Sequence, residues 1–143
     1  MKRMPTIKNV MTPFPYSVDA EASVAEAMQF MRAHKIRHLP VMEAGELKGI
    51  VSDRDIKLIL GPDFAHPDAS ELKVRDAMVA EPYVVDIATR LDSVVRHMAE
   101  RRLGSVLVTR KGKLVGVFTY TDACAAFADL LASEFPAPGD DAA

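Results

Sequence analysis

The hydrophobic pattern of the chain predicts two amphipathic helices of the same form. In each of them, apolar residues recur at the i, i+3, i+4, i+7 spacing of a single helix face. The first set is Val24, Ala27, Met28 and Met31, and the second set is Leu91, Val94, Val95 and Met98. Because helices of this kind bury one face, each is expected to cover a sheet or another helix.

Capping signals precede both helices. Ser23 stands three residues before Glu26, and Thr89 stands three residues before Asp92. A hydroxyl followed by an acid at this distance is the spacing of a capping box, in which the hydroxyl accepts a backbone N–H of the first turn. We therefore expect Ser23 and Thr89 to be the N-caps.

Short apolar runs on either side of these helices predict strands. PYSVD (15–19) and PYVVD (82–86) each have the pattern of a strand that follows a proline. After each helix, two further apolar runs are joined by EAGE (43–46) or RKGK (110–113). Both linking sequences are typical of a tight hairpin turn in which glycine takes a positive φ.

The two sets of elements are copies of one another. Residues 7–55 align with residues 74–122 at a constant offset of 67 without a gap, and 11 of the 49 aligned pairs are identical. Ordinary composition would give about three identities by chance. A second helix is expected after each hairpin, from Asp53 to about Leu60 and from Thr121 to about Ala132. Each copy thus has the order β-α-β-β-α, preceded by a short helical turn, and the fold class is α/β (α+β).

The two copies end in related motifs, GIVSDRD (49–55) and GVFTYTD (116–122). The hydroxyl-x-x-aspartate pattern within them has a purely structural interpretation as a capping box. It also has a functional one, because a capped helix N-terminus favours phosphate and an ionised aspartate accepts hydrogen bonds from a ribose diol. The two roles are compatible, and the residues alone leave both open.

The composition excludes several classes of function. The 143 residues fit one ordinary domain or two very small ones, and the net charge of −2 gives no general reason to expect nucleic-acid binding. The apolar runs are too short to span a membrane, and the N-terminus lacks the apolar segment of a secretory signal. The single cysteine, Cys124, excludes an internal disulfide and is expected to be a small buried helix residue. We expect a cytoplasmic protein.

Two β-α-β-β-α copies, each opening in V-M or A-M and closing in G-h-h-S/T-x-x-D, resemble the cystathionine-β-synthase (CBS) domain pair, or Bateman module, of the stand-alone bacterial type. The resemblance covers repeat 1 at residues 7–62 and repeat 2 at 74–132, with 63–73 as a linker and 133–143 as a disordered tail. The stretches that carry it are VMTPFPYSV, HKIRHLPVME and GELKGIVSDRDI in the first copy, and AMVAEPYVV and RRLGSVLVTRKGKLVGVFTYTD in the second.

This resemblance implies a regulatory protein. Two repeats pack sheet to sheet about a pseudo-twofold axis, and the clefts between them bind AMP, ADP, ATP or an adenosyl compound such as S-adenosylmethionine. Such modules pair as homodimers, and a further protein reads the state of the ligand site. No required cofactor, metal, membrane or nucleic-acid partner is implied. A ligand-independent dimerisation or scaffold module is the alternative.

The resemblance also assigns roles to individual residues. Asp55 and Asp122 bind the ribose, and Ser52 and Thr119 support the sugar-phosphate. The base pocket draws on the first strand of each repeat, with backbone groups of Val51 and Phe118; its strand residues are Tyr16, Ser17, Val18, Tyr83, Val84 and Val85.

The basic residues differ between the repeats. Arg37 and His38 align with Gly104 and Ser105, and Arg54 aligns with Thr121. If the family's basic residues reach across the pseudo-twofold axis, Arg37 and His38 serve the site built on Asp122. Arg54 has two open interpretations, a phosphate contact or a surface ion pair with its flanking aspartates.

No catalytic constellation is present in the sequence. No nucleophile elbow, P-loop or paired carboxylates are found, so we expect no enzyme activity. His34, His66 and His97 lack neighbours at zinc-site spacing and are expected on the solvated surface.

Overall fold

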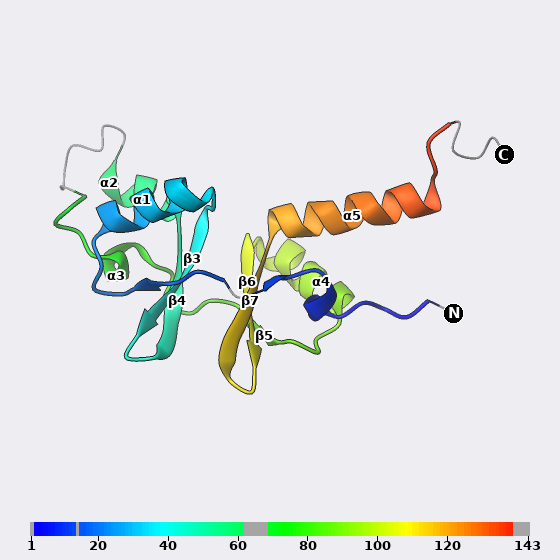
Figure 1. Ribbon diagram of the computed structural model, residues 1–143, viewed down its shortest axis with the longest axis horizontal. Helices are drawn as coiled ribbons and strands as arrows, with labels where there is room; N and C mark the ends of the chain where they lie inside the picture. The colour runs from blue at the N-terminus through cyan, green and yellow to red at the C-terminus, as the bar shows by residue number, and fades with distance from the viewer. Residues whose placement is uncertain (1, 14, 62–68, 139–143) are drawn as a thin grey trace. The chain divides into compact units, whose positions relative to one another are not determined.

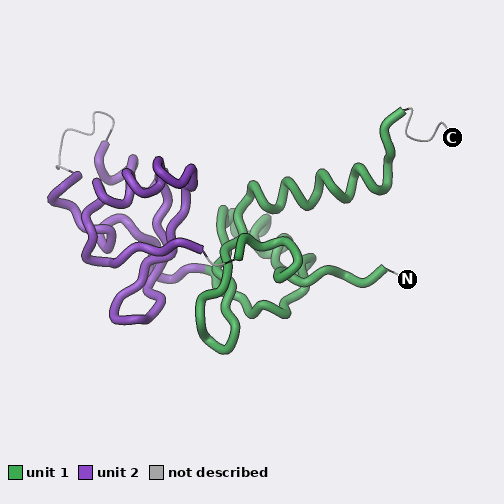
Figure 2. The backbone as a smooth tube through the Cα atoms, viewed as in Figure 1, with its two compact units in different colours: residues 1–14, 83–143 green, residues 15–82 purple. Residues whose placement is uncertain are grey.

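The computed structural model describes residues 2–13, 15–61 and 69–138. The chain forms two compact units, and Figure 2 shows which segments each contains. Unit 1 consists of Met1–Phe14 and Tyr83–Ala143, and unit 2 consists of Pro15–Pro82. Part of the proposed linker 63–73 and of the proposed tail 133–143 lies outside the described residues, as does His66.

Unit 2 is a three-stranded sheet covered by helices (Figure 1). Its elements in chain order are β2 (Val18–Asp19), α1 (Val24–His34), β3 (His38–Glu43), β4 (Glu46–Ser52), α2 (Asp53–Leu60) and α3 (Val74–Ala77). The sheet order is β2-β3-β4, with β2 parallel and β4 antiparallel to β3. The apolar face of α1 is buried as its spacing predicts, because Val24, Ala27 and Met31 lie in the core of this unit.

Unit 1 repeats this plan. It contains the 3₁₀ helix η1 (Ile7–Asn9), β1 (Thr12–Pro13), β5 (Val84–Asp86), α4 (Leu91–Arg101), β6 (Ser105–Arg110), β7 (Lys113–Thr119) and α5 (Tyr120–Glu134). The sheet order is β1-β7-β6-β5. Val94 and Met98 of α4 pack with Phe118 and other core residues. The β-α-β-β-α order predicted from the sequence is therefore confirmed in both copies.

The segment that begins each repeat packs on the unit of the other repeat. Residues before Phe14 belong to unit 1, where β1 pairs with β7 through Thr12 opposite Val117. Conversely, α3 belongs to unit 2, where Val79 and Ile50 exchange backbone hydrogen bonds of 3.1 and 2.8 Å. The sequence repeats and the compact units thus have different limits.

The hairpin turns have the predicted geometry. Gly45 and Gly112 have φ of 79° and 78°, and the residues before them, Ala44 and Lys111, also have positive φ. Positive φ at both central positions of a two-residue loop matches the right-handed twist of the strands that it joins.

One of the two predicted N-caps is correct. The Ser23 hydroxyl accepts the backbone N–H of Glu26 at 3.1 Å, as expected. Thr89 is not the N-cap of α4; Arg90 is. Thr89 instead belongs to the preceding turn, where its N–H donates to the Asp86 carbonyl at 3.0 Å and its carbonyl accepts the Ile7 N–H at 2.8 Å.

The last helix differs from its prediction in two respects. It runs two residues beyond Ala132, to Glu134, and Cys124 on it is exposed rather than buried. The reason is that α5 has no fully buried residue and extends away from the sheet of its unit (Figure 1). Among the residues that the structure describes, no helix is long and apolar enough to cross a membrane.

Candidate ligand-binding site

The Ser52–Asp55 motif of unit 2 forms a complete capping box at the start of α2. The Asp55 N–H donates to the Ser52 hydroxyl at 3.0 Å, and the Ser52 N–H donates to Oδ2 of Asp55 at 2.9 Å. Both side chains are partly buried. Among the described residues, Oδ1 of Asp55 accepts no hydrogen bond, so this oxygen remains available to a ligand hydroxyl.

The Thr119–Asp122 motif of unit 1 has the corresponding position at the start of α5, but its carboxylate accepts more hydrogen bonds than that of Asp55. The Thr119 N–H donates to Oδ2 of Asp122 at 2.9 Å, and the Thr119 hydroxyl lies 3.4 Å from the same oxygen. The Thr12 hydroxyl donates to Oδ1 of Asp122 at 3.3 Å. Val79 aligns with Thr12 in the repeat, and its side chain has no donor for Asp55. The two carboxylates therefore differ in their free hydrogen-bonding capacity.

The glycine that opens each motif has a packing role. A Cβ on Gly49 would overlap the carbonyl oxygen of Val79, and one on Gly116 would overlap the Sδ of Met11. These contacts come from the segments that cross β4 and β7 within each unit. The glycines thus allow the leading segment of each repeat to approach the motif-carrying strand of the other repeat.

His38 lies beside the Ser52–Asp55 motif in unit 2. It begins β3 directly opposite Ser52 on β4, and opposite residues of an antiparallel pair project to the same face of the sheet. Burial lowers the pKa of the His38 imidazole below its ordinary value, while the nearby Asp53 and Asp55 carboxylates act in the opposite direction. In the second copy, Ser105 lies opposite Thr119 and provides no titratable group.

The two arginines of this region are exposed. The Arg37 carbonyl accepts the Asp53 N–H at 3.0 Å, which ties the start of β3 to the start of α2. Arg54 forms no ion pair with any described residue, so the predicted alternative of a pair with its flanking aspartates is not found there. Asp53 pairs instead with Lys57, at 3.5 Å, and Asp55 bonds to Ser52.

The residues expected around the base lie on β2 and β5 or directly before them, and the valines take part in sheet pairing. Val18 pairs with Val41, Val84 pairs with Leu107, and buried Val85 pairs with Val108. Ser17 is exposed just before β2. Val51 and Phe118 are fully buried, so only their backbone groups are candidates for ligand contact.

The two tyrosines pack against helices of their own units. The Tyr16 ring lies 5.2 Å from Phe30 and 4.2 Å from His34, and the Tyr83 ring lies 4.3 Å from His97. Burial raises the pKa of the Tyr83 hydroxyl. His34 and His97 thus have aromatic partners, although His34 is exposed as expected. Within the described ranges, no three His, Cys, Asp or Glu side chains are grouped as metal ligands.

The comparison with known protein families decides the identity of the fold. The profile of the CBS domain matches the chain twice, at residues 7–61 and 74–129. The chain belongs to the CBS-domain family. Each matched segment contains one copy of the duplicated β-α-β-β-α sequence, not one compact unit.

Individual proteins are similar over most of the chain. The YlbB protein of Bacillus subtilis strain 168 is 34% identical over 121 residues, which cover 83% of this chain and 80% of YlbB. The zinc metalloprotease MJ0392 of Methanocaldococcus jannaschii is also 34% identical, over 80% of this chain, but the chain spans only 30% of that relative. The solved structure of CBSX2, a CBS-pair protein of Arabidopsis thaliana, in complex with AMP is 29% identical, with a TM-score of 0.73 and coverage of 87% of this chain and 97% of CBSX2.

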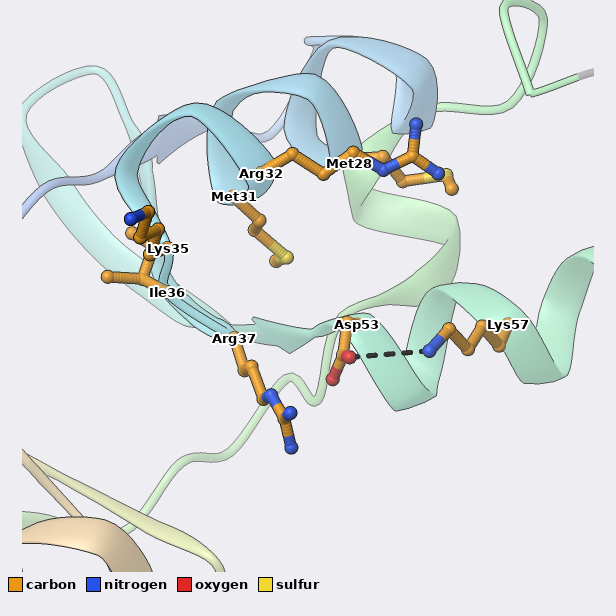
Figure 3. A pocket seen from close by; sticks show the side chains of 8 residues that line it. All are labelled: Met28, Met31, Arg32, Lys35, Ile36, Arg37, Asp53 and Lys57. Carbon is orange, nitrogen blue, oxygen red and sulfur yellow. Dashed lines mark hydrogen bonds and ion pairs between the residues drawn. The ribbon is translucent and has the colours of Figure 1, made fainter.

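Sequence reasoning missed two features of this CBS pair. Thr12 lies 110 residues from Asp122 along the chain, so no local pattern indicates their hydrogen bond. The second feature is a pocket beside the Ser52–Asp55 motif, lined partly by Arg37 and Asp53 (Figure 3). In the sequence, the excess of cations at the end of α1 could have indicated this pocket. The helix dipole explains those cations equally well, so they did not predict it.

Proposed function

We propose that this CBS-pair protein is a regulatory sensor of an adenosine nucleotide or adenosyl compound. The observation that carries the proposal is the duplicated aspartate at a helix N-terminus, with Oδ1 of Asp55 unoccupied among the described residues. An ionised carboxylate at this place is suited to a ribose diol, and the helix N-terminus beside it is suited to phosphate. The similar CBS pair of CBSX2 has been solved with AMP, which supports the same class of ligand here.

The proposed roles of the residues follow from their positions. Asp55 and Asp122 accept hydrogen bonds from the ribose, and Ser52 and Thr119 hold these carboxylates in place. Arg37 and Arg54 supply positive charge for phosphate, and His38, whose lowered pKa favours the neutral imidazole, supplies a ring N–H as a hydrogen-bond donor. Tyr16, Ser17, Val18, Tyr83, Val84 and Val85 border the base, through backbone groups where the side chain is buried or stacked.

The mechanism of signalling is a shift between two conformations. A ligand that binds one arrangement of the protein more tightly than another raises the population of that arrangement, by no more than its difference in affinity. We propose that the protein acts without catalysis as a cytoplasmic homodimer, and that a partner protein reads the ligand-bound arrangement.

Thermal melting in the presence of defined nucleotides tests this function. Protein freed of carried-over ligand should be stabilised by AMP, ADP, ATP, S-adenosylmethionine or NADH, by about 2.7 kcal/mol at a hundredfold excess over Kd. The matched control is 2′,3′-dideoxy-AMP, which lacks the diol and should stabilise the protein far less than AMP. If none of these compounds raises the melting temperature, the proposed function is wrong.

A ligand-independent scaffold is the second candidate. The observation that favours it is the engagement of Asp55 and Asp122 in capping hydrogen bonds, which gives both carboxylates a structural reason to be present. Replacing either aspartate would then reduce stability without any loss of ligand response.

A further inference from the structure

A pocket of about 380 Å³ lies on the helical side of unit 2, between the end of α1 and the start of α2 (Figure 3). This volume is within the usual range for small-molecule sites. Three apolar residues, Met28, Met31 and Ile36, contribute to its wall. The remaining lining residues are charged: Arg32, Lys35, Arg37, Asp53 and Lys57.

The charge of this pocket is strongly unbalanced. Four of the lining residues are cationic and one, Asp53, is a carboxylate, which pairs with Lys57 at 3.5 Å. Arg32, Lys35 and Arg37 form no ion pair with any residue in the described part of the chain. Like charges gathered around one concavity repel each other and attract a counter-ion, so the field of the pocket favours an anion.

The second copy of the repeat provides an internal control. Arg32, Arg37 and Lys57 align with Ala99, Gly104 and Cys124, and only Lys35 keeps a cationic counterpart, Arg102. The apolar positions, in contrast, remain apolar in both copies. Met28, Met31 and Ile36 align with Val95, Met98 and Leu103. The apolar wall is therefore common to both copies, as packing of the fold requires, whereas the cationic rim is a property of the first copy alone.

A helix dipole does not explain the whole rim. Arg32 and Lys35 lie at the C-terminal end of α1, where cations are favoured. Lys57 lies in the last turn of α2, where the dipole of that helix favours a cation, whereas Arg37 precedes β3 and lies outside both helices. The ends of two different helices and Arg37 thus contribute cations to one pocket, which the dipole of a single helix does not explain.

We propose that this pocket is a binding site for a multiply charged phosphate group. Guanidinium groups bind phosphate oxygens through paired hydrogen bonds, and lysines add point charges. A monophosphate carries a charge of about −1.5 to −2 at neutral pH, less than the three cations that form no ion pair, so pyrophosphate or triphosphate chemistry fits better. The pocket adjoins the Ser52–Asp55 motif through Asp53 and Arg37, whose backbone groups share a hydrogen bond of 3.0 Å.

Two sources would provide this chemistry. One is the phosphate chain of a nucleotide held at Asp55, and the other is a separate polyphosphate anion. Isothermal titration of the full chain with tripolyphosphate, AMP and ATP distinguishes them. The variant is R32A/K57A, which gives the first copy an alanine at each of two rim positions, and the matched control is K48A, a lysine of β4 that lies outside the pocket and pairs with Glu46.

We expect the wild type and K48A to bind tripolyphosphate equally, and R32A/K57A to bind it at least about tenfold more weakly, with circular dichroism showing an unchanged fold. If the source is the phosphate chain of a nucleotide, R32A/K57A also weakens the binding of ATP much more than the binding of AMP. If it is a separate anion, the affinities for ATP and AMP change by the same factor. Equal binding of tripolyphosphate by R32A/K57A and wild type, or no binding by wild type at millimolar concentration, would overturn the proposal. Tripolyphosphate binding that depends on Arg32 and Lys57, in a protein that ignores AMP, would leave this site standing and reject the adenosyl function.

Discussion

The hydroxyl of Thr12 donates a hydrogen bond of 3.3 Å to Oδ1 of Asp122, across 110 residues of sequence. It joins the segment that begins the first repeat to the motif that closes the second. Since Val79 takes the corresponding position in the other copy, the two aspartates of the duplicated motif have different surroundings. The duplication has therefore produced two related motifs with unequal hydrogen bonding.

Replacing Thr12 tests this contact. T12V should lower the free energy of unfolding of unit 1 by about 0.5–1 kcal/mol, because one exposed hydrogen bond to a charged group is lost. T12S keeps the hydroxyl and should retain most of the stability. Urea denaturation followed by circular dichroism measures both variants, and equal loss in T12S and T12V would mean that the methyl group, not the hydroxyl, is responsible.

The unequal carboxylates predict unequal roles in ligand binding. D55A should weaken AMP binding by about tenfold or more, since Asp55 has a free oxygen and Arg37, His38 and Arg54 lie in the same unit. D122A should have a smaller effect. Isothermal titration measures both affinities; a larger loss in D122A would instead support the expectation that Arg37 and His38 serve the site built on Asp122.

The same two variants separate the sensor from the scaffold. Loss of a capping aspartate costs about 0.5–2 kcal/mol of stability in either case. A sensor also loses affinity for AMP, whereas a scaffold has none to lose.

The two motif glycines should differ in their tolerance of alanine. In G49A the new Cβ meets the backbone of Val79, which is fixed by its hydrogen bonds to Ile50, so we expect a loss of about 1–3 kcal/mol. In G116A the Cβ meets only the flexible side chain of Met11, which has freedom to move, so the loss should be smaller. Denaturation midpoints of the two variants measure the difference, and equal costs would show that the crossing segments do not constrain the glycines in this way.

His38 predicts a dependence of stability on pH. Because burial lowers its pKa in the folded state, the unfolded chain takes up a proton first as the pH falls below about 6.5. The contribution of His38 to stability is therefore complete above that pH and is lost as the pH falls toward the lowered pKa. H38Q should show a shallower loss of stability than the wild type as the pH falls below about 6.5. Parallel slopes of the free energy of unfolding in this range would show that His38 does not contribute.

The sequence was sufficient to predict the order of the elements, because the period of the hydrophobic pattern and the duplication support each other. Asp53–Leu60 was predicted as a helix and is observed with the same limits. The prediction of Thr89 as the N-cap of α4 was wrong. Thr89 and Asp92 have the spacing of a capping box, but the Thr89 N–H donates to the Asp86 carbonyl in the preceding turn.

The candidate site was predictable only where it is local. The Ser52–Asp55 capping box follows from its three-residue spacing, and the structure contains it. The contact of Thr12 with Asp122, the approach of Val79 to Gly49 and the cationic rim around Lys57 all depend on chain segments brought together by folding. The first two contacts join different repeats, so no pattern within one repeat contains them. The rim lies within the first repeat, but only folding brings the end of α1 beside α2.

Native mass spectrometry of the ligand-free chain titrated with AMP tests the central claim most directly, because it reports both the number of bound nucleotides and the number of chains. We predict a homodimer that gains the mass of AMP at micromolar concentration, and a D55A/D122A variant that remains folded and gains little or none. A wild-type chain that binds no AMP, or a double variant that binds it as well as the wild type, would contradict the proposed role of the two aspartates.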